Sequence, residues 1–130
     1  MKRIFISLML LFTSIFADVK YTNIFDAYEI AEAQNKPVLL MLSKKGCPGC
    51  EYMLDVVYKN PEVVEYINKH FVAVDIDVYE EGAPEGLEYF GTPTFYFLDK
   101  DENVLKRVNG GQKVDEFLQT LKGVAQSSKK

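Results

Sequence analysis

The chain is poor in the residues that build a structural metal site. Its 130 residues include two cysteines, Cys47 and Cys50, and a single histidine, His70. A structural zinc ion takes four ligands, mostly from cysteine and histidine, so these three side chains do not complete such a site. We expect His70, at the end of a predicted helix, to be an ordinary surface residue. Two thiolates alone can still hold Cu(I), so a copper-binding module stays open as an interpretation.

An excess of positive charge is missing as well. The sequence has 15 basic and 19 acidic residues, and its formal net charge is −4. Binding to nucleic acid or to an anionic membrane surface depends on clustered positive charge. Neither is therefore expected as a partner of this protein.

No apolar run is long enough to span a membrane. The longest, residues 4–16, falls short of the ~20 residues that a spanning helix needs. It follows Lys2-Arg3 and is closed by the small residue Ala17, a pattern typical of a cleaved export signal. We therefore predict a signal peptide at residues 1–17 and a periplasmic protein; an uncleaved anchor is the alternative. Losing the two positive charges of Lys2 and Arg3 takes the formal charge from −4 to −6.

Internal repeats and low-complexity linkers are also absent. With 48% hydrophobic and 13% aromatic residues, the chain has enough apolar side chains for one core but is too short for two domains. The sequence predicts a single domain at residues 18–125, a loose tail at 126–130, and a monomer.

The apolar pattern of this domain alternates between helical and strand periods. Helices are predicted at 24–35 after the cap Asn23, at 50–58, from Pro61 after the cap Asn60, at 84–90, and from Val114 onward. Strands are predicted at 38–42, 71–77, 94–98 and 104–108, the last two forming a hairpin. This order favours an α/β fold, with a central mixed sheet and helices on both faces.

The two cysteines stand in the motif Cys47-Pro48-Gly49-Cys50, where a predicted strand passes into a predicted helix. Cys47 would cap that helix, and the free N–H groups and the helix dipole would lower the pKa of its thiol. Pro48 suits the first helical position, and Gly49 leaves the backbone near the sulfur uncrowded. Lys44 and Lys45 add positive charge nearby.

This placement favours thiol chemistry because only a thiolate attacks a disulfide. Cys47 is the predicted nucleophile, and Cys50, one helical turn further, is placed to resolve the mixed disulfide. A purely structural disulfide between them would close a very short loop and stabilise the fold little.

A second motif, Gly91-Thr92-Pro93-Thr94, places a proline at the start of a strand that otherwise reads as central. Proline is unfavourable there unless its missing N–H or its isomer is useful; an ordinary turn proline is the alternative. Together with the cysteine motif and Gly110-Gly111 before the last helix, it makes the chain resemble the thioredoxin family over the whole predicted domain.

The resemblance implies a thioredoxin fold in which Pro93 is cis and packs beside the cysteines, and the backbone of Thr92 binds an extended substrate. Pro48 and Gly49 would belong to the same substrate surface. No cofactor is implied, because the two sulfurs carry the electrons. Implied partners are disulfide-containing protein substrates.

Within the family, residues 47–77 are similar to the thioredoxin-like domain of the periplasmic electron carrier DsbD and to small exported thioredoxins linked to sulfur oxidation. This similarity predicts an exported thiol:disulfide oxidoreductase that acts as a reductant and is itself reduced by a membrane thiol partner. The leading proline of Pro48-Gly49 points the other way, since the oxidant DsbA shares it.

Two positions depart from the family pattern. Met41 stands where thioredoxin has a buried aspartate, six residues before the first cysteine, and Gly46 replaces the tryptophan that precedes that cysteine. Met41 cannot carry a proton to or from Cys50. Glu51 is the nearest acidic residue in sequence, and we expect it to be exposed.

Overall fold

The computed structural model describes residues 17–129, so the predicted signal peptide at 1–17 lies outside the described residues apart from Ala17. The four strands are β1 (Val38–Ser43), β2 (Val72–Asp77), β3 (Thr94–Leu98) and β4 (Val104–Asn109). The helices are α1 (Ile24–Gln34), α2 (Pro48–Asp55), a short 3-10 helix η1 (Val57–Lys59), α3 (Pro61–His70) and α4 (Val114–Ser127). No helix within residues 17–129 is both long and apolar enough to cross a membrane.

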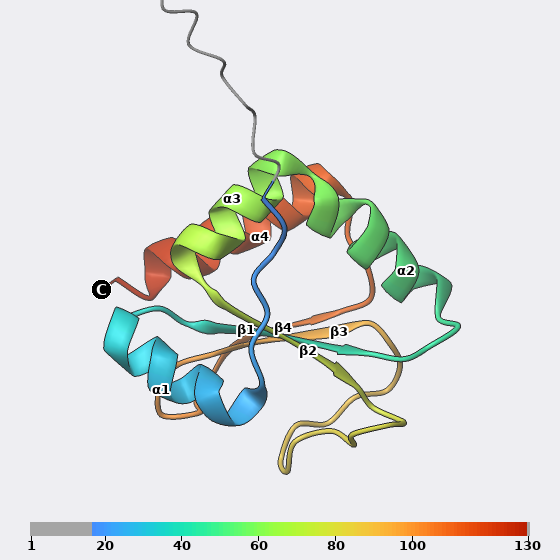
Figure 1. Ribbon diagram of the computed structural model, residues 1–130, viewed down its shortest axis with the longest axis horizontal. Coiled ribbons are helices and arrows are strands. Elements are labelled where there is room, and N and C mark those ends of the chain that lie inside the picture. Colours follow the sequence, from blue (N-terminus) through green and yellow to red (C-terminus); the bar gives the residue numbers. More distant parts are fainter. Residues whose placement is uncertain (1–16, 130) are drawn as a thin grey trace, which may run out of the picture.

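The strands form one mixed sheet in the order β2-β1-β3-β4. β1 pairs with β2 in parallel and with β3 antiparallel, and β3 and β4 form the hairpin. Figure 1 shows α1 on one face of the sheet and α2, α3 and α4 on the other. The predicted α/β fold with helices on both faces is confirmed.

Side chains of β1 alternate between two apolar cores because successive residues of a strand point to opposite faces. Leu39 and Met41 pack with α2, α3 and α4 in the core that also contains both cysteines. Leu40 and Leu42 pack against α1 in the second core. Every residue of β1 is buried, which explains why its sequence is a continuous apolar run.

The predicted helix caps are confirmed. The Asn23 side chain accepts a hydrogen bond from the N–H of Asp26. The Asn60 side chain accepts from the N–H groups of Glu62 at 3.0 Å and Val63 at 3.3 Å. These bonds satisfy donors that the first turn of a helix otherwise leaves unpaired.

The Asn60 cap should contribute measurably to stability. We expect Asn60→Ala to lower the free energy of unfolding by about 1 kcal/mol, because it removes the acceptor for two N–H groups. Urea denaturation followed by circular dichroism measures this loss. Asn60→Asp, which keeps the acceptor, should stay close to the parent protein, and an equal loss in both variants would contradict the capping role.

The helix predicted at residues 84–90 is wrong. This segment is part of the connection between β2 and β3 and contains turns but no helix. Gly86 has φ +83°, a left-handed conformation that interrupts a helix. Within residues 84–90, Leu87 is the one hydrophobic residue that packs partly against the core on the α1 side of the sheet. The segment therefore has little buried surface to stabilise a helix.

Two further boundaries differ from the predictions. The helix predicted at 50–58 divides into α2 and η1, and α4 runs to Ser127, so the first two residues of the tail predicted at 126–130 are helical.

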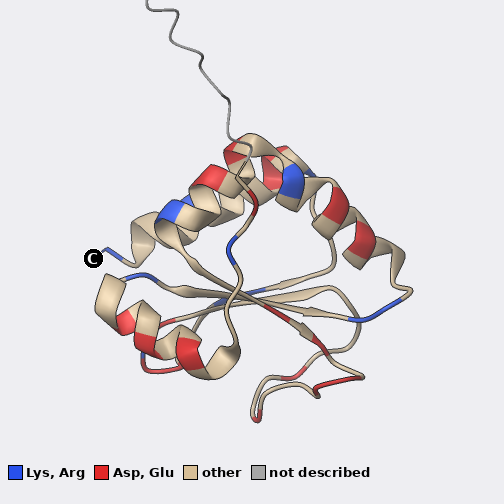
Figure 2. Cartoon of the chain, in the orientation of Figure 1, with Lys and Arg blue, Asp and Glu red and all other residues tan. Residues whose placement is uncertain are grey.

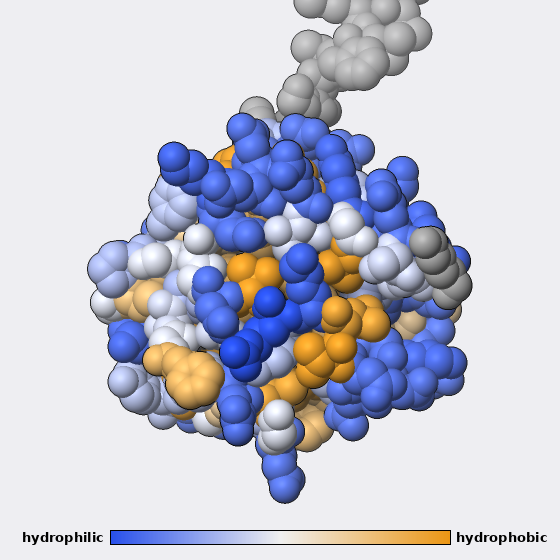
Figure 3. Space-filling model, turned by 180° about the vertical axis from the view of Figure 1, so that it is seen from behind, coloured by the Kyte–Doolittle hydropathy of each residue, from blue (hydrophilic) through white to orange (hydrophobic). Residues whose placement is uncertain are grey.

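The outer strand β4 is largely exposed. On the face seen from behind, hydrophilic side chains break up the apolar patches (Figure 3).

Candidate active site

The cysteine motif lies at the junction of β1 and α2, as predicted. Cys47 is the N-cap of α2, and its Sγ accepts a hydrogen bond from the N–H of Cys50 at 3.2 Å. Pro48 follows in the first turn, where its missing N–H costs nothing. Cys47 and Cys50 form a disulfide with their Cα atoms 5.3 Å apart, and their exposed fractions are 5% and 2%.

The turn before the cysteines requires glycine. Gly46 has φ +75°, in the left-handed region where a side chain is strained. The left-handed conformation of this turn explains why glycine, and not the tryptophan of the family pattern, stands at position 46.

The segment around Pro93 lies directly beside the cysteines. The Thr92–Pro93 peptide bond is cis, as the family resemblance implies, and Pro93 is buried. A Cβ atom added to Gly49 would lie only 3.2 Å from Cδ of Pro93, so the two residues are in close contact. The Pro93 carbonyl accepts a hydrogen bond from the Gly110 N–H at 2.8 Å, which fixes this loop to the end of β4.

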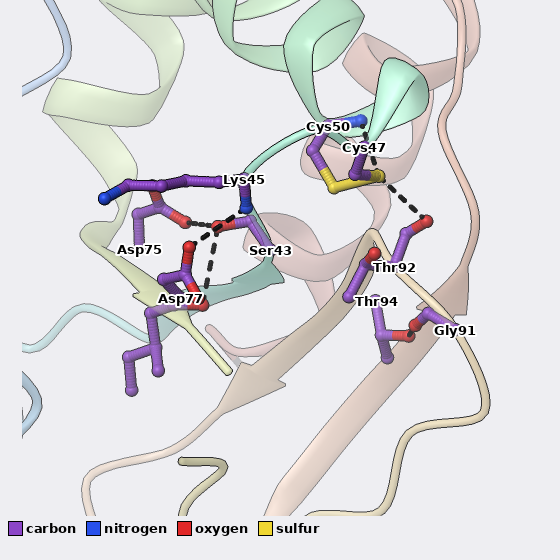
Figure 4. Close-up of a disulfide and its surroundings, with 10 residues drawn as sticks. Ser43, Lys45, Cys47, Cys50, Asp75, Asp77, Gly91, Thr92 and Thr94 are labelled. Carbon is purple, nitrogen blue, oxygen red and sulfur yellow. Dashed lines mark hydrogen bonds between the residues drawn. A yellow bond between two sulfur atoms is a disulfide. The ribbon is translucent and has the colours of Figure 1, made fainter. Parts of the chain in front are cut away.

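The carbonyl oxygen of Thr92 faces the reactive pair. It lies 3.3 Å from Sγ of Cys47, and Figure 4 shows it directed at that sulfur. In the dithiol form the Cys47 S–H can donate a hydrogen bond to this oxygen. The structure thus brings all six predicted site residues together: Cys47, Pro48, Gly49, Cys50, Thr92 and Pro93.

Next to this loop is a shallow groove of about 230 Å³, lined by residues 90–94, Asn109 and Gly110. Phe90 at its rim is 87% exposed, and the guanidinium carbon of Arg107 lies 5.8 Å from the centre of its ring. Sequence analysis did not single out Phe90. The one feature of the sequence that could have identified it is its position, an aromatic residue three positions before Pro93.

A larger open cleft of about 510 Å³ lies on the other side of the disulfide. Ser43, Cys50, Glu51 and Asp75 are among the residues that line it. The Ser43 hydroxyl donates a hydrogen bond to Oδ1 of Asp75 at 2.7 Å. Burial raises the pKa of Asp75, and this hydrogen bond opposes the rise. Glu51 is exposed, as expected.

Lys44 and Lys45, which precede the cysteine motif, line this cleft. The partners of their side chains are residues after β2 and not Cys47. Lys45 forms an ion pair with Glu80, and Nζ of Lys44 lies 5.6 Å from the centre of the Tyr79 ring. Acidic residues lie at the end of β2 and in the connection after it, opposite these lysines (Figure 2). Because Lys45 is paired, the N-terminus of α2 is the more direct source of stabilisation for a Cys47 thiolate.

The described residues offer little for a multidentate metal centre. Within residues 17–129 no three or more His, Cys, Asp or Glu side chains are grouped so that they could hold a metal ion. His70 ends α3 and packs against Tyr66, with ring centroids 4.3 Å apart.

A sequence model of the thioredoxin-like domain matches residues 24–125, which span the sheet, its helices and both motifs. The chain belongs to the thioredoxin-like family. Its fold and its Cys-x-x-Cys pair are those of thiol:disulfide oxidoreductases in general.

Solved structures agree with this assignment to the thioredoxin-like family. A thioredoxin from Thermus thermophilus is 27% identical, with a TM-score of 0.69 over 83% of this chain and 88% of that one. The oxidised C-terminal domain of DsbD from Neisseria meningitidis is 24% identical, with a TM-score of 0.57 over 80% of this chain and 98% of that domain. The oxidoreductase DsbH is 18% identical, with a TM-score of 0.67 over 85% and 86% of the two chains.

The last two similarities support the thioredoxin fold alone. No curated protein matches this chain in sequence.

Proposed function

We propose that this thioredoxin-like protein is an exported thiol:disulfide oxidoreductase. It exchanges the Cys47–Cys50 dithiol or disulfide with disulfide-containing partner proteins, and it acts as a reductant in the periplasm. The observation that carries the proposal is the position of Cys47, whose sulfur caps α2 and faces the Thr92 carbonyl. Export is supported by the basic and apolar pattern of residues 1–17.

In the proposed reaction the Cys47 thiolate attacks a substrate disulfide. A bond forms between Sγ of Cys47 and one substrate sulfur, and the other substrate sulfur leaves as a thiolate. The Cys50 thiolate then attacks Sγ of Cys47, which forms the Cys47–Cys50 disulfide and releases the second substrate sulfur. Two electrons pass from the protein to the substrate, and a membrane thiol partner restores the dithiol.

The substrate surface of this proposal is the area around Pro93. Pro48 and Gly49 border the sulfurs, and the Thr92 backbone lies beside Cys47, where an extended chain can add main-chain hydrogen bonds. The exposed ring of Phe90 gives this surface an apolar margin.

A metal-free redox titration tests the function against the copper alternative. We expect the purified protein, treated with a chelator, to interconvert reversibly between dithiol and disulfide in dithiothreitol buffers and to reduce a protein disulfide such as that of insulin. A Cu(I) carrier would instead purify with copper and show no such turnover.

A further inference from the structure

Cys50 must lose a proton before it can resolve a mixed disulfide. Only 2% of the residue is exposed, and burial in apolar surroundings raises the pKa of a thiol. Met41, which is fully buried on the adjoining strand, has no group that can take this proton. Another acceptor must therefore serve this side of the disulfide.

The sheet register places a carboxylate next to Met41. Asp75 of β2 is the direct partner of Met41 of β1 in the parallel pairing. Ala73, two residues before Asp75, packs in the core that holds Met41 and both cysteines. Because alternate residues of a strand share a face, Asp75 lies on the cysteine face of the sheet.

Asp75 and Cys50 also open into the same space. Both line the 510 Å³ cleft together with Ser43, and Ser43, which is 5% exposed, holds the carboxylate through its hydrogen bond to Oδ1. In Figure 4 the Cys50 sulfur is on the side of the disulfide nearer Ser43 and Asp75, and the Cys47 sulfur is on the side of Thr92. The cleft has room for water molecules between the two groups.

We propose that Asp75, held in place by Ser43, is the proton acceptor for Cys50 in the resolving step. The inference rests on the proposed exchange function. The Cys50 thiol gives its proton, through water in the cleft, to the Asp75 carboxylate, and the resulting thiolate attacks Sγ of Cys47. The substrate sulfur leaves as a thiolate and takes a proton from solvent. In the reverse direction the Asp75 carboxylic acid returns the proton to Cys50 as that sulfur leaves.

The surroundings of Asp75 suit this exchange. Burial raises the pKa of its carboxyl group, and the charges of Asp77 and Glu81 add to the rise. An acceptor whose pKa moves toward neutrality is more effective at neutral pH. The other ionisable groups that line the cleft or interact with Asp75 are Lys44, Lys45, Glu51 and Glu80 at the cleft and the phenols of Tyr21 and Tyr58.

The test separates the two chemical steps. Reduced protein is mixed with the aromatic disulfide 5,5′-dithiobis(2-nitrobenzoate), which releases one coloured thiolate when Cys47 attacks and a second when Cys50 resolves. In Asp75→Asn we expect an unchanged first phase and a second phase slowed by roughly 10- to 100-fold at about pH 7. The difference between the two proteins should narrow as the pH rises above about 9, because hydroxide can then take the proton in place of Asp75.

Control variants distinguish proton transfer from simple loss of charge or structure. Glu51→Gln removes the same charge from the same cleft but no proton acceptor, so it should not slow the second phase. Asp75→Glu should retain the parent pH profile. Ser43→Ala should slow the second phase several-fold and shift its pH profile, since Ser43 positions the carboxylate.

A purely electrostatic role for Asp75 would give the opposite sign. Removing a negative charge near Cys50 lowers the pKa of that thiol and would accelerate the second phase of Asp75→Asn at about pH 7. That result, or an unchanged second phase, overturns the inference while leaving the exchange function intact. Absence of the first phase in the parent protein would instead contradict the proposed function.

Discussion

Cys50→Ser is expected to trap partner proteins covalently on Cys47, and Cys47→Ser is expected to lose disulfide exchange altogether. The two sulfurs differ in position: Cys47 caps α2 and contacts the Thr92 carbonyl, whereas Cys50 lies one turn into the helix. A thiol at a helix N-terminus is the more acidic, and Cys47 is 5% exposed against 2% for Cys50. Without Cys50 the mixed disulfide forms but is not resolved.

The measurement is made in cells that produce each variant. After acid quenching and alkylation, non-reducing gels should show adducts of Cys50→Ser that disappear on reduction, and mass spectrometry then identifies the partners. The matched control is the double variant Cys47→Ser/Cys50→Ser, which should form no adducts. Adducts on Cys47→Ser but not on Cys50→Ser would reverse the assigned roles.

The local structure around Cys47 was accessible from sequence because it depends on neighbouring residues. A buried apolar run followed by Cys47-Pro48 indicates a strand that passes into a capped helix, and the helix has that cap. Asn23 and Asn60 were predictable as caps for the same reason. Short-range steric and hydrogen-bonding preferences decide such features.

The cleft beside Cys50 was not predictable, because it depends on the pairing of two distant strands. Asp75 is an acidic residue within the otherwise apolar part of β2, and an acidic residue in such a strand indicates a candidate functional residue. Only the register with Met41 shows which face it occupies. Nearness in sequence instead pointed to Glu51, which is exposed.

The helix wrongly predicted at residues 84–90 is an error of another kind, because here a local pattern was present but the helix did not form. Residues 84–90 have a composition compatible with a helix, but Gly86 adopts a left-handed conformation and most of the segment is exposed. A short helix without a buried face has little to stabilise it.

We expect the protein to be a reductant, with a reduction potential nearer the ~ −270 mV of thioredoxin than the ~ −120 mV of DsbA. DsbA is strongly oxidising because its reduced form is stabilised. Here carboxylates of Glu51, Asp75, Asp77 and Glu80 line the cleft at Cys50, and Glu80 pairs with Lys45. Negative charge beside a thiolate disfavours it and so favours the disulfide.

Equilibration of the purified protein in dithiothreitol buffers measures this potential. Each 30 mV corresponds to about 1.4 kcal/mol, so a potential near that of thioredoxin is easily distinguished from one near that of DsbA. Glu80→Gln leaves the Lys45 charge unpaired near the thiols and should move the potential toward the oxidising side, whereas Glu85→Gln, which does not line this cleft, should not. In acid-quenched cells most of the protein should carry free thiols, since a membrane partner must keep a reductant reduced outside the cytosol. A potential near the DsbA value, together with a fully formed Cys47–Cys50 disulfide in cells, would identify the protein as an oxidant.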